Sequence, residues 1–231
     1  GYNDGFAFCY KIPDGKGPCV NVQSELTAYN FAGDYTAWFY NGENHNIGPE
    51  KLTETDGTRL PVMTVKAGDK HYMAIHEACL ETGAPLVLQS KGGESLFSVA
   101  SKPTSLSPGY TSAWRVVLDG TTPGVLTDSH LLELLNPDPD SRYDFSWVKP
   151  GLAVWDWRIN GAVWDGFTYG MSYPSWVRMV DFAAEQGFKY LVLDANWYGP
   201  EFESDSDPVK GEKAQDVQRL LKYGKEKGVG I

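Results

Sequence analysis

The pattern of hydrophobic and polar positions divides this chain into two regions. From Gly1 to about Pro137, short apolar and β-branched runs alternate with clusters of Gly, Asp, Asn and Ser. Many short strands separated by turn residues are typical of an all-β sandwich or barrel. The predicted strands are Phe6–Ile12, Val20–Tyr29, Thr36–Tyr40, Arg59–Val65, His71–Ala78, Pro85–Gln89, Ser95–Ala100 and Ala113–Leu118.

The first region ends in a predicted helix and a linker. Apolar residues have helical spacing in Thr127–Asn136, where Asp128 or Ser129 can cap the first turn. The acids and prolines that follow favour a surface segment between two domains. The expected organisation is a β-sandwich domain over 1–137, a linker over 138–147, and a second domain over 148–231.

In the second region, strands and helices alternate. The apolar runs Leu152–Val154 and Tyr190–Leu193 suit buried parallel strands. Helices are predicted between them and over Glu212–Lys227, and the final "VGI" begins a third strand. The first helix has one apolar stripe with a period of 3.6 residues, formed by Trp176, Met179, Val180 and Ala183. These units predict the opening part of a barrel, so we expect the chain to be a fragment, truncated in its third strand.

Charge and composition exclude several classes of function. The 231 residues carry a net charge of −10, with a pI near 4.8. Such a balance argues against binding to nucleic acid or to anionic membranes. No apolar run of about 18 residues is present, so no membrane span is predicted. The three cysteines leave two alternatives open: a bridge between Cys9 and Cys19 across a turn sequence, or three free thiols.

Acidic and aromatic residues follow both strands of the second region. Trp155, Asp156 and Trp157 follow the first strand, and Asp194, Asn196 and Trp197 follow the second. Ligands of parallel β/α units gather at the carboxyl ends of the strands. Indole rings stack on the apolar faces of sugars, and glycoside hydrolysis needs a pair of carboxylates. We therefore predict a sugar-binding site there, with wall packing and a hydrogen-bonded Asp as the alternative.

Glu77 is the candidate metal ligand. Alternation along the strand His71–Ala78 places Glu77 on the same face as Met73 and Ile75. An acid in that position lies at a solvated rim, has a buried partner, or binds a metal, for which its oxygens would suit Ca²⁺. The loop 204–213 resembles a calcium loop in composition only, so we interpret it as solvated.

Four segments resemble glycoside hydrolase family 97. They are "YMAIHEACL", "AWRVVLDG", "SWVKPGLAVWDW" and "MVDFAAEQGFKYLVLDANWYG", in that order. The resemblance implies an N-terminal β-super-sandwich followed by a catalytic (β/α)8 TIM barrel, of which this chain would hold only the first strands and helices. It also implies α-glucosidase or α-galactosidase activity on an oligosaccharide or α-glycoside, one Ca²⁺ ion, and a periplasmic or extracellular location in a bacterium.

The resemblance assigns roles by position. Glu77 matches the glutamate that the sandwich contributes to the calcium site, and Trp155–Trp157 and Asp194–Trp197 match two substrate-binding strand ends. The catalytic residues and the other calcium ligands are expected beyond Ile231, so residues 1–231 alone should be inactive. Asn196 stands where the family pattern Asp-x-Gly-Trp has glycine, which leaves the substrate preference open. The alternatives are a non-catalytic carbohydrate-binding sandwich, or another barrel α-galactosidase that needs no calcium.

Overall fold

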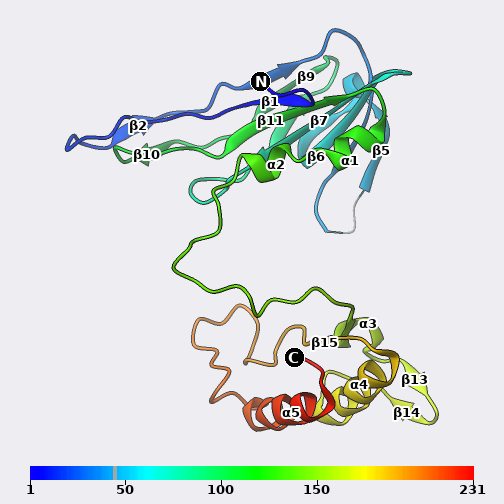
Figure 1. Cartoon of the computed structure of the whole chain (residues 1–231). Helices are drawn as coiled ribbons and strands as arrows, with labels where there is room; N and C mark the ends of the chain where they lie inside the picture. Colours follow the sequence, from blue (N-terminus) through cyan, green and yellow to red (C-terminus); the bar gives the residue numbers. More distant parts are fainter. Residues whose placement is uncertain (44–45) are drawn as a thin grey trace. The chain divides into compact units, whose positions relative to one another are not determined.

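The computed structural model describes residues 1–43 and 46–231, which form two compact units (Figure 1). Unit 1 is Gly1–Asp140 and unit 2 is Ser141–Ile231. The strands of unit 1 are β1 (Gly5–Phe8), β2 (Val20–Val22), β3 (Ala28–Asn30), β4 (Thr36–Tyr40), β5 (Asn46–Lys51), β6 (Asp56–Gly68), β7 (His71–Ala78), β8 (Leu88–Lys91), β9 (Leu96–Val99), β10 (Thr104–Leu106) and β11 (Trp114–Gly120). Its helices are the 3₁₀ turn η1 (Leu52–Glu54), α1 (Pro123–Asp128) and α2 (Leu131–Leu134).

The long strand β6 organises unit 1. Its beginning, Asp56–Arg59, pairs with β8, whereas its later part pairs with β4 on one edge and β7 on the other. All of these pairings are antiparallel, and they give the strand order β1-β11-β7-β6-β8-β9-β3. One strand shared by two sets of neighbours makes the sheet curl, as in a β-sandwich.

The core of unit 1 lies inside this curled sheet. Side chains from β4, β6, β7, β8 and β9 alternate inward and bury one cluster: Ala37, Phe39, Met63, Val65, Ile75, Leu88, Phe97 and Val99. On the opposite face of β7 and β11, Val116 and Leu118 pack beneath Leu131 and Leu135 at α2. These two strands are therefore buried on both faces, which explains the nearly unbroken apolar run in β11.

The predicted elements of unit 1 agree with the structure in part. Thr36–Tyr40 and His71–Ala78 are strands with the predicted bounds, and the other predicted strands overlap observed ones with shifted ends. Val20–Tyr29 overlaps two strands, β2 and β3. The strands β5 and β10 were not predicted. The single helix predicted over Thr127–Asn136 is wrong, because the chain is extended at Ser129 between α1 and α2. Ser129 lies just before the N-cap of α2, His130, and its Oγ accepts the N–H of Leu131 at 3.2 Å.

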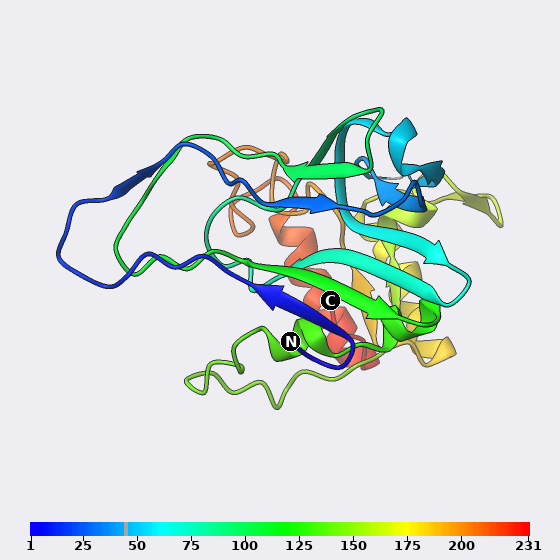
Figure 2. The same cartoon turned by 90° about the horizontal axis from the view of Figure 1, so that it is seen from above.

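The turn sequence between Cys9 and Cys19 does not join a hairpin. Strand β1 pairs with β11, and β2 pairs with β10 near the end of a long arm that extends from the sheet (Figures 1 and 2). Cys9 follows β1 and Cys19 precedes β2, so the two cysteines adjoin strands with different partners. Within the described part of the chain, Cys9, Cys19 and Cys79 are all free thiols.

Unit 2 is built from parallel β/α units. Strand β12 (Ala153–Trp155) pairs in parallel with β15 (Tyr190–Val192), and α4 (Tyr173–Gln186) connects them. Helix α5 (Ala214–Lys227) leads to Gly230, which forms an isolated parallel bridge with Tyr190. Between β12 and α4 lie elements that the sequence did not predict: α3 (Asp156–Ile159) and the hairpin of β13 (Val163–Trp164) and β14 (Phe167–Thr168).

The predicted apolar stripe of α4 faces the core of unit 2. Trp176, Met179, Val180 and Ala183 are buried there with Leu191, Val217, Leu220 and Val229. Gly187 ends α4 with φ +73°, a left-handed conformation that glycine adopts without strain. The helices cover one face of the parallel strands, while Trp155 and Val192 on the other face stay partly exposed. The two strands therefore have one covered face and one open face.

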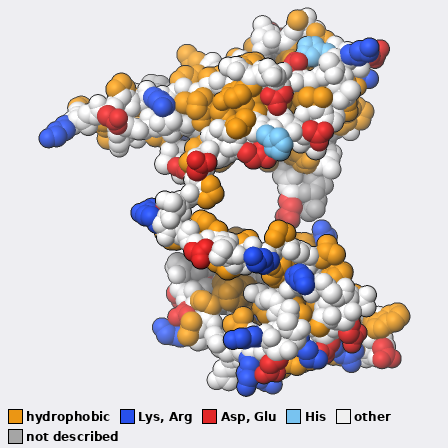
Figure 3. Space-filling model, in the orientation of Figure 1, with side chains coloured by type: hydrophobic (Ala, Val, Ile, Leu, Met, Phe, Trp, Pro, Cys, Tyr) orange, Lys and Arg blue, Asp and Glu red, His pale blue; other side chains and the backbone are white. Residues whose placement is uncertain are grey.

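Charged side chains are mixed by sign on unit 2, as the visible face in Figure 3 shows. Among the described residues, each helix is too short or too polar to cross a bilayer.

Candidate functional site

The exits of β12 and β15 are joined by hydrogen bonds. Because the strands are parallel, with Trp155 opposite Val192, their carboxyl ends lie at the same edge. Trp155 Nε1 donates to Asp194 Oδ2 at 2.7 Å, and the backbone N–H of Asp194 donates to Asp156 Oδ1 at 2.9 Å. The structure thus brings together three of the residues that the sequence placed at one sugar site.

Asp156 lies beneath this junction and is only 1% exposed. Its second oxygen, Oδ2, accepts the indole N–H of Trp176 on α4 at 2.8 Å. Both carboxylate oxygens therefore bind donors within the protein, and burial keeps the side chain away from a sugar at the surface. The geometry makes Asp156 a positioning residue that ties the two strand exits to α4, which is the hydrogen-bonded alternative left open by the sequence.

Asp194 is also engaged at both oxygens. Oδ2 accepts the indole of Trp155, and Oδ1 accepts the N–H of Ala195 at 2.8 Å. The first of these bonds fixes the edge of the Trp155 ring, and the side chain stays 37% exposed. Asp194 therefore orients an aromatic ring at the strand exit.

Trp155, Trp157 and Arg158 form a surface that we call the indole platform. The two rings are 37% and 46% exposed, with centroids 5.4 Å apart and planes inclined by 33°. The Arg158 guanidinium carbon lies 5.2 Å from the Trp155 centroid and 4.9 Å from that of Trp157. Arg158 was not predicted as a site residue, and both distances are in the range of cation–π contacts.

Asn196 and Trp197 follow Asp194 and contact partners outside the platform. Asn196 has φ +65°, a left-handed conformation that asparagine tolerates better than most residues, and its Oδ1 accepts the N–H of Glu201 at 3.0 Å. Asparagine can therefore take the place of glycine in the Asp-x-Gly-Trp pattern. Trp197 packs against the unit 2 core and contacts the Tyr198 ring edge-on at 5.4 Å. Strand β15 ends at Val192, before the turn at Asn196, so strand alternation does not extend to Trp197.

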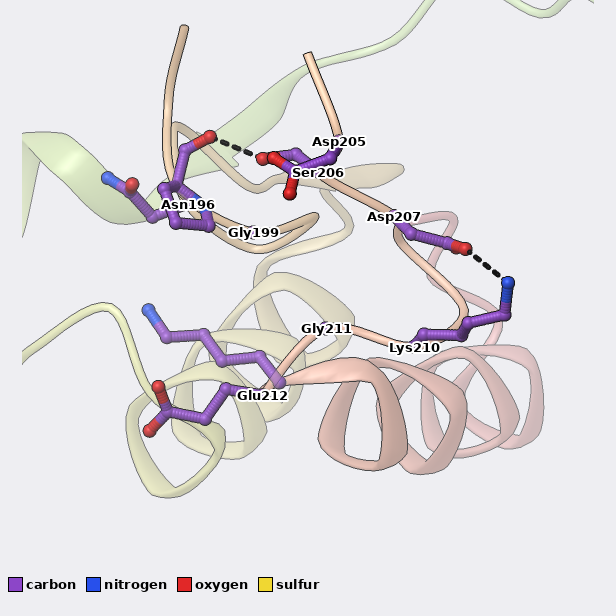
Figure 4. A pocket seen from close by; sticks show the side chains of 10 residues that line it. Asn196, Gly199, Asp205, Ser206, Asp207, Lys210, Gly211 and Glu212 are labelled. Atoms are coloured by element: carbon purple, nitrogen blue, oxygen red, sulfur yellow. Dashed lines mark hydrogen bonds and ion pairs between the residues drawn. The ribbon is translucent and has the colours of Figure 1, made fainter. Parts of the chain in front are cut away.

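The loop between β15 and α5 encloses a pocket of about 610 Å³ (Figure 4). Its wall consists mainly of polar residues: Asn196, Gly199, Pro200, Asp205, Ser206, Asp207, Lys210, Gly211, Glu212 and Lys213. Asp207 pairs with Lys210 at 3.2 Å. Across the described residues, this loop and the rest of the chain hold no group of three or more His, Cys, Asp or Glu side chains suited to a metal.

Glu77 lies near the end of β7 in unit 1 and has the buried partner that the sequence left open. Its Oε2 accepts the N–H of Leu86 at 2.8 Å and lies 3.5 Å from Nη1 of Arg115. Arg115 is 4% exposed and also makes two hydrogen bonds to Glu25, of 2.9 and 2.6 Å. Within the described residues, the structure gives no hydrogen bond to Glu77 Oε1, so this oxygen could act as a ligand.

Two glutamates therefore share one arginine, and their pKa values shift in opposite directions. Burial raises the pKa of Glu77, and the Leu86 N–H and Arg115 only partly offset that rise. Burial also opposes ionisation of Glu25, but hydrogen bonds from Arg115 and Thr27 outweigh it and hold the pKa of Glu25 below its ordinary value. Burial raises the pKa of the neighbouring Tyr29 to about 12. The cluster is thus a buried ion-pair network with one carboxylate more than it has cations.

The fold and the strand exits define a class of protein: a β-sandwich followed by parallel β/α units with aromatic and acidic residues at their carboxyl ends. Comparison with protein families agrees. The profile of the glycosyl-hydrolase 97 N-terminal domain matches residues 1–137, and that of glycoside hydrolase 97 matches residues 154–231. The chain belongs to glycoside hydrolase family 97.

Two curated relatives carry α-galactosidase names. A retaining alpha-galactosidase of Bacteroides thetaiotaomicron is 28% identical over 273 residues, covering 100% of this chain and 40% of the relative. A probable retaining alpha-galactosidase of Streptomyces bingchenggensis is 28% identical over 249 residues, covering 99% of this chain and 35% of the relative. The chain therefore spans less than half the length of these relatives.

Solved structures show the same fold. A family 97 enzyme from Pseudoalteromonas sp., in complex with acarbose, aligns with a TM-score of 0.75 at 24% identity. The alignment covers 99% of this chain and 38% of the Pseudoalteromonas chain. A β-arabinopyranosidase aligns with a TM-score of 0.72 at 19% identity, and the alignment covers 98% of this chain and 38% of the β-arabinopyranosidase chain.

Proposed function

We propose that this chain supplies the sandwich and the first strands and helices of a (β/α)8 TIM barrel in an α-glycoside hydrolase of the α-galactosidase type. Membership of family 97 and the two α-galactosidase relatives support the reaction class. One observation carries the assignment to this edge of the sheet: the hydrogen bond from Trp155 to Asp194, which joins neighbouring parallel strand exits under an exposed pair of indoles.

The residues of this chain would bind and orient the sugar. The rings of Trp155 and Trp157 offer exposed faces against which the apolar side of a sugar ring can pack. Glycoside hydrolysis uses a general acid and a second carboxylate acting as base or nucleophile. Since Asp156 and Asp194 are engaged at both oxygens, we place the catalytic pair elsewhere, in line with the expectation that it lies beyond Ile231.

We also propose that Glu77 contributes one oxygen to a calcium site. Its Oε2 is held by Leu86 and Arg115, and Oε1 is the oxygen left for a ligand. Calcium takes six to eight oxygen ligands, so Glu77 fits the site only as one member of a larger set. When bound, the ion would help to hold the sugar and polarise the glycosidic bond.

The calcium proposal is tested by equilibrium binding. Glu77→Gln keeps the size of the side chain and removes its charge, and should weaken calcium binding to the protein. Glu226→Gln on the exposed side of α5 is the control and should bind as the wild type does. Unchanged calcium affinity in the Glu77 variant would contradict the assignment.

The partner we propose is an oligosaccharide or α-glycoside. Two of the similar structures are complexes with acarbose and panose, both oligosaccharides. We further propose a periplasmic or extracellular location, which fractionation of the source bacterium with an antibody to the sandwich can test. Recovery of the protein in the cytoplasmic fraction alone would contradict that location.

Sugar binding by the chain itself tests the main proposal. Isothermal titration with methyl α-galactopyranoside should show binding that is lost in Trp157→Ala. It should be retained in Trp164→Ala, which removes an indole that is 74% exposed in the β13–β14 hairpin. Equal binding in both variants would contradict the platform. Residues 1–231 should also fail to hydrolyse an aryl α-galactoside, and measurable turnover would refute our placement of the catalytic pair.

A second candidate is a carbohydrate-binding function of the sandwich. Trp38 and Tyr40 alternate with buried residues on β4, are 36% and 45% exposed, and line a pocket of about 230 Å³ with Thr64 and Asn46. Trp38→Ala separates the candidates: loss of sugar binding in this variant, with Trp157→Ala unaffected, would favour the sandwich.

A further inference from the structure

We infer that Arg158 is a specificity-determining residue of the indole platform, donating paired hydrogen bonds to two adjacent oxygens of a sugar unit. The inference rests on the proposed sugar-binding function. Nothing in the sequence pattern or in the family comparison assigns a role to this arginine, and the case for it is geometric.

Arg158 lies in α3, directly after the last platform tryptophan. Its guanidinium is about equally close to both rings, at 5.2 and 4.9 Å from their centroids. Over the described residues, the structure gives the side chain of Arg158 no carboxylate or carbonyl partner. A stacked but otherwise unpaired guanidinium is a positive charge held beside an exposed aromatic surface.

Another stacked arginine of unit 2 shows the difference. Arg219 lies 4.1 Å from the Tyr173 centroid, and its Nη1 also binds Asp216 at 3.3 Å, so its charge is already paired. Arg158 could have been paired in the same way by the acids at the strand exits. Instead, Asp156 and Asp194 accept hydrogen bonds from indole and backbone donors. Within the described residues, neither acid is bonded to Arg158, whose N–H donors stay available to an external acceptor.

The chemistry of that acceptor follows from the guanidinium group. Contact with the rings uses the face and leaves the N–H donors at its edge, in a planar fork that matches two oxygens side by side. Stacking also restricts the side chain before a ligand arrives, which lowers the entropic cost of binding. A sugar lying on the indoles can present such a pair as neighbouring hydroxyls or as the carboxylate of a uronic acid.

The test uses the whole 231-residue chain labelled with ¹⁵N, following the indole N–H signals of Trp155 and Trp157. Methyl α-galactopyranoside supplies the hydroxyl pair, and methyl α-galactopyranosiduronic acid supplies the carboxylate. Arg158→Gln removes the charge, and Arg158→Lys keeps the charge without the fork. Arg178→Lys is the matched control, since Arg178 lies 4.0 Å from the Phe167 centroid in the same unit, outside the platform.

We expect both Arg158 variants to bind the preferred sugar about 10-fold more weakly or worse, as for the loss of hydrogen bonds to a charged group. The control should bind as the wild type does, and dispersed indole signals in every variant show that it is folded. If the preferred acceptor is the carboxylate of the uronic acid, Arg158→Lys should bind it more tightly than Arg158→Gln does, because it keeps the charge. If the acceptor is a pair of hydroxyls, the two variants should bind with equal affinity.

Two outcomes overturn the inference and differ from each other. Equal affinity in the wild type and in Arg158→Gln removes the role of Arg158 and leaves the platform intact. If neither sugar shifts the indole signals of the wild type, the proposed sugar site fails, and the role of Arg158 fails with it.

Discussion

Buried carboxylates are held by different partners in the two units. In unit 1, Glu25 and Glu77 share the guanidinium of Arg115, which is 4% exposed. In unit 2, Asp156 is 1% exposed and is held by neutral donors, the Trp176 indole and the backbone N–H of Asp194.

This difference in partners suggests different roles: the Arg115 network stabilises unit 1, whereas the hydrogen bonds of unit 2 support a ligand-binding surface. Removing the cation from a buried ion pair leaves an uncompensated charge, whereas removing one neutral hydrogen bond costs less. Arg115 joins β11 to β7 and to the segment before β3, through three hydrogen bonds to Glu25 and Glu77. The neutral donors of unit 2 satisfy its acids and leave Arg158 and two indole faces exposed, so we place the sugar there.

The largest effect is expected from Arg115→Met. This change leaves Glu25 and Glu77 without their cation and should lower the free energy of unfolding by about 3–5 kcal/mol. Urea denaturation of the chain, followed by circular dichroism, measures it. Arg219→Met, which breaks the exposed pair with Asp216, should cost no more than about 1 kcal/mol. Equal losses in the two variants would remove the distinction between the units.

Asp156→Asn should lower the free energy of unfolding by a smaller amount. The amide has one acceptor oxygen for two donors, so either the Trp176 indole or the Asp194 N–H is left unpaired, at a cost of about 1–3 kcal/mol. Tryptophan fluorescence during denaturation reports both the loss and the changed environment of Trp176. Asp205→Asn, at an exposed loop position, is the control. A variant as stable as this control would show that the junction does not depend on Asp156.

The two platform tryptophans should contribute differently to stability, because only the Trp155 indole donates a hydrogen bond to Asp194. Trp155→Phe and Trp157→Phe remove similar apolar area, but only the first removes the bond to Asp194. Trp155→Phe should therefore be the less stable of the two by about 1 kcal/mol. The comparison is made by parallel urea titrations. If Trp157→Phe is equally destabilised, the indole bond contributes nothing to stability.

The pH dependence of stability should separate the two glutamates of unit 1. The pKa of Glu25 lies below its ordinary value of 4.5, so its contribution is present above pH 4.5 and is lost as the pH falls through the folded pKa. The pKa of Glu77 is raised, so its contribution is present below 4.5 and is lost as the pH rises through the folded pKa. For each of Glu25→Gln and Glu77→Gln, the free energy of unfolding is measured between pH 3 and 8 and subtracted from that of the wild type. The two differences should change with pH in opposite directions. Differences that change in the same direction would contradict these pKa shifts.

Much of unit 2 could be predicted because its signals are local. The α4 stripe has a clear period, Gly187 ends the helix, and the order strand, helix, strand places both exits at one edge. The elements α3 and β13–β14 lack such periodicity, being only two to four residues long. The roles of single exit residues were harder to predict, since the alternation that orders them ends with the strands, at Trp155 and at Val192, before the left-handed Asn196.

Partners distant in sequence could not be predicted at all. Alternation placed Glu77 on an apolar face and so required a partner, but Arg115 lies 38 residues away on another strand. The indole of Trp176 reaches Asp156 from 20 residues further along the chain, on a helix. Such contacts depend on how elements pack, which no local pattern records.

The most direct test of the central claim is a crystal structure of the chain with methyl α-galactopyranoside. Our account predicts the sugar ring over Trp155 and Trp157, with the bond from Trp155 to Asp194 intact and the Arg158 guanidinium against two adjacent sugar oxygens. A sugar bound only beside Trp38 and Tyr40 on the sandwich, with the indole platform empty, would contradict it.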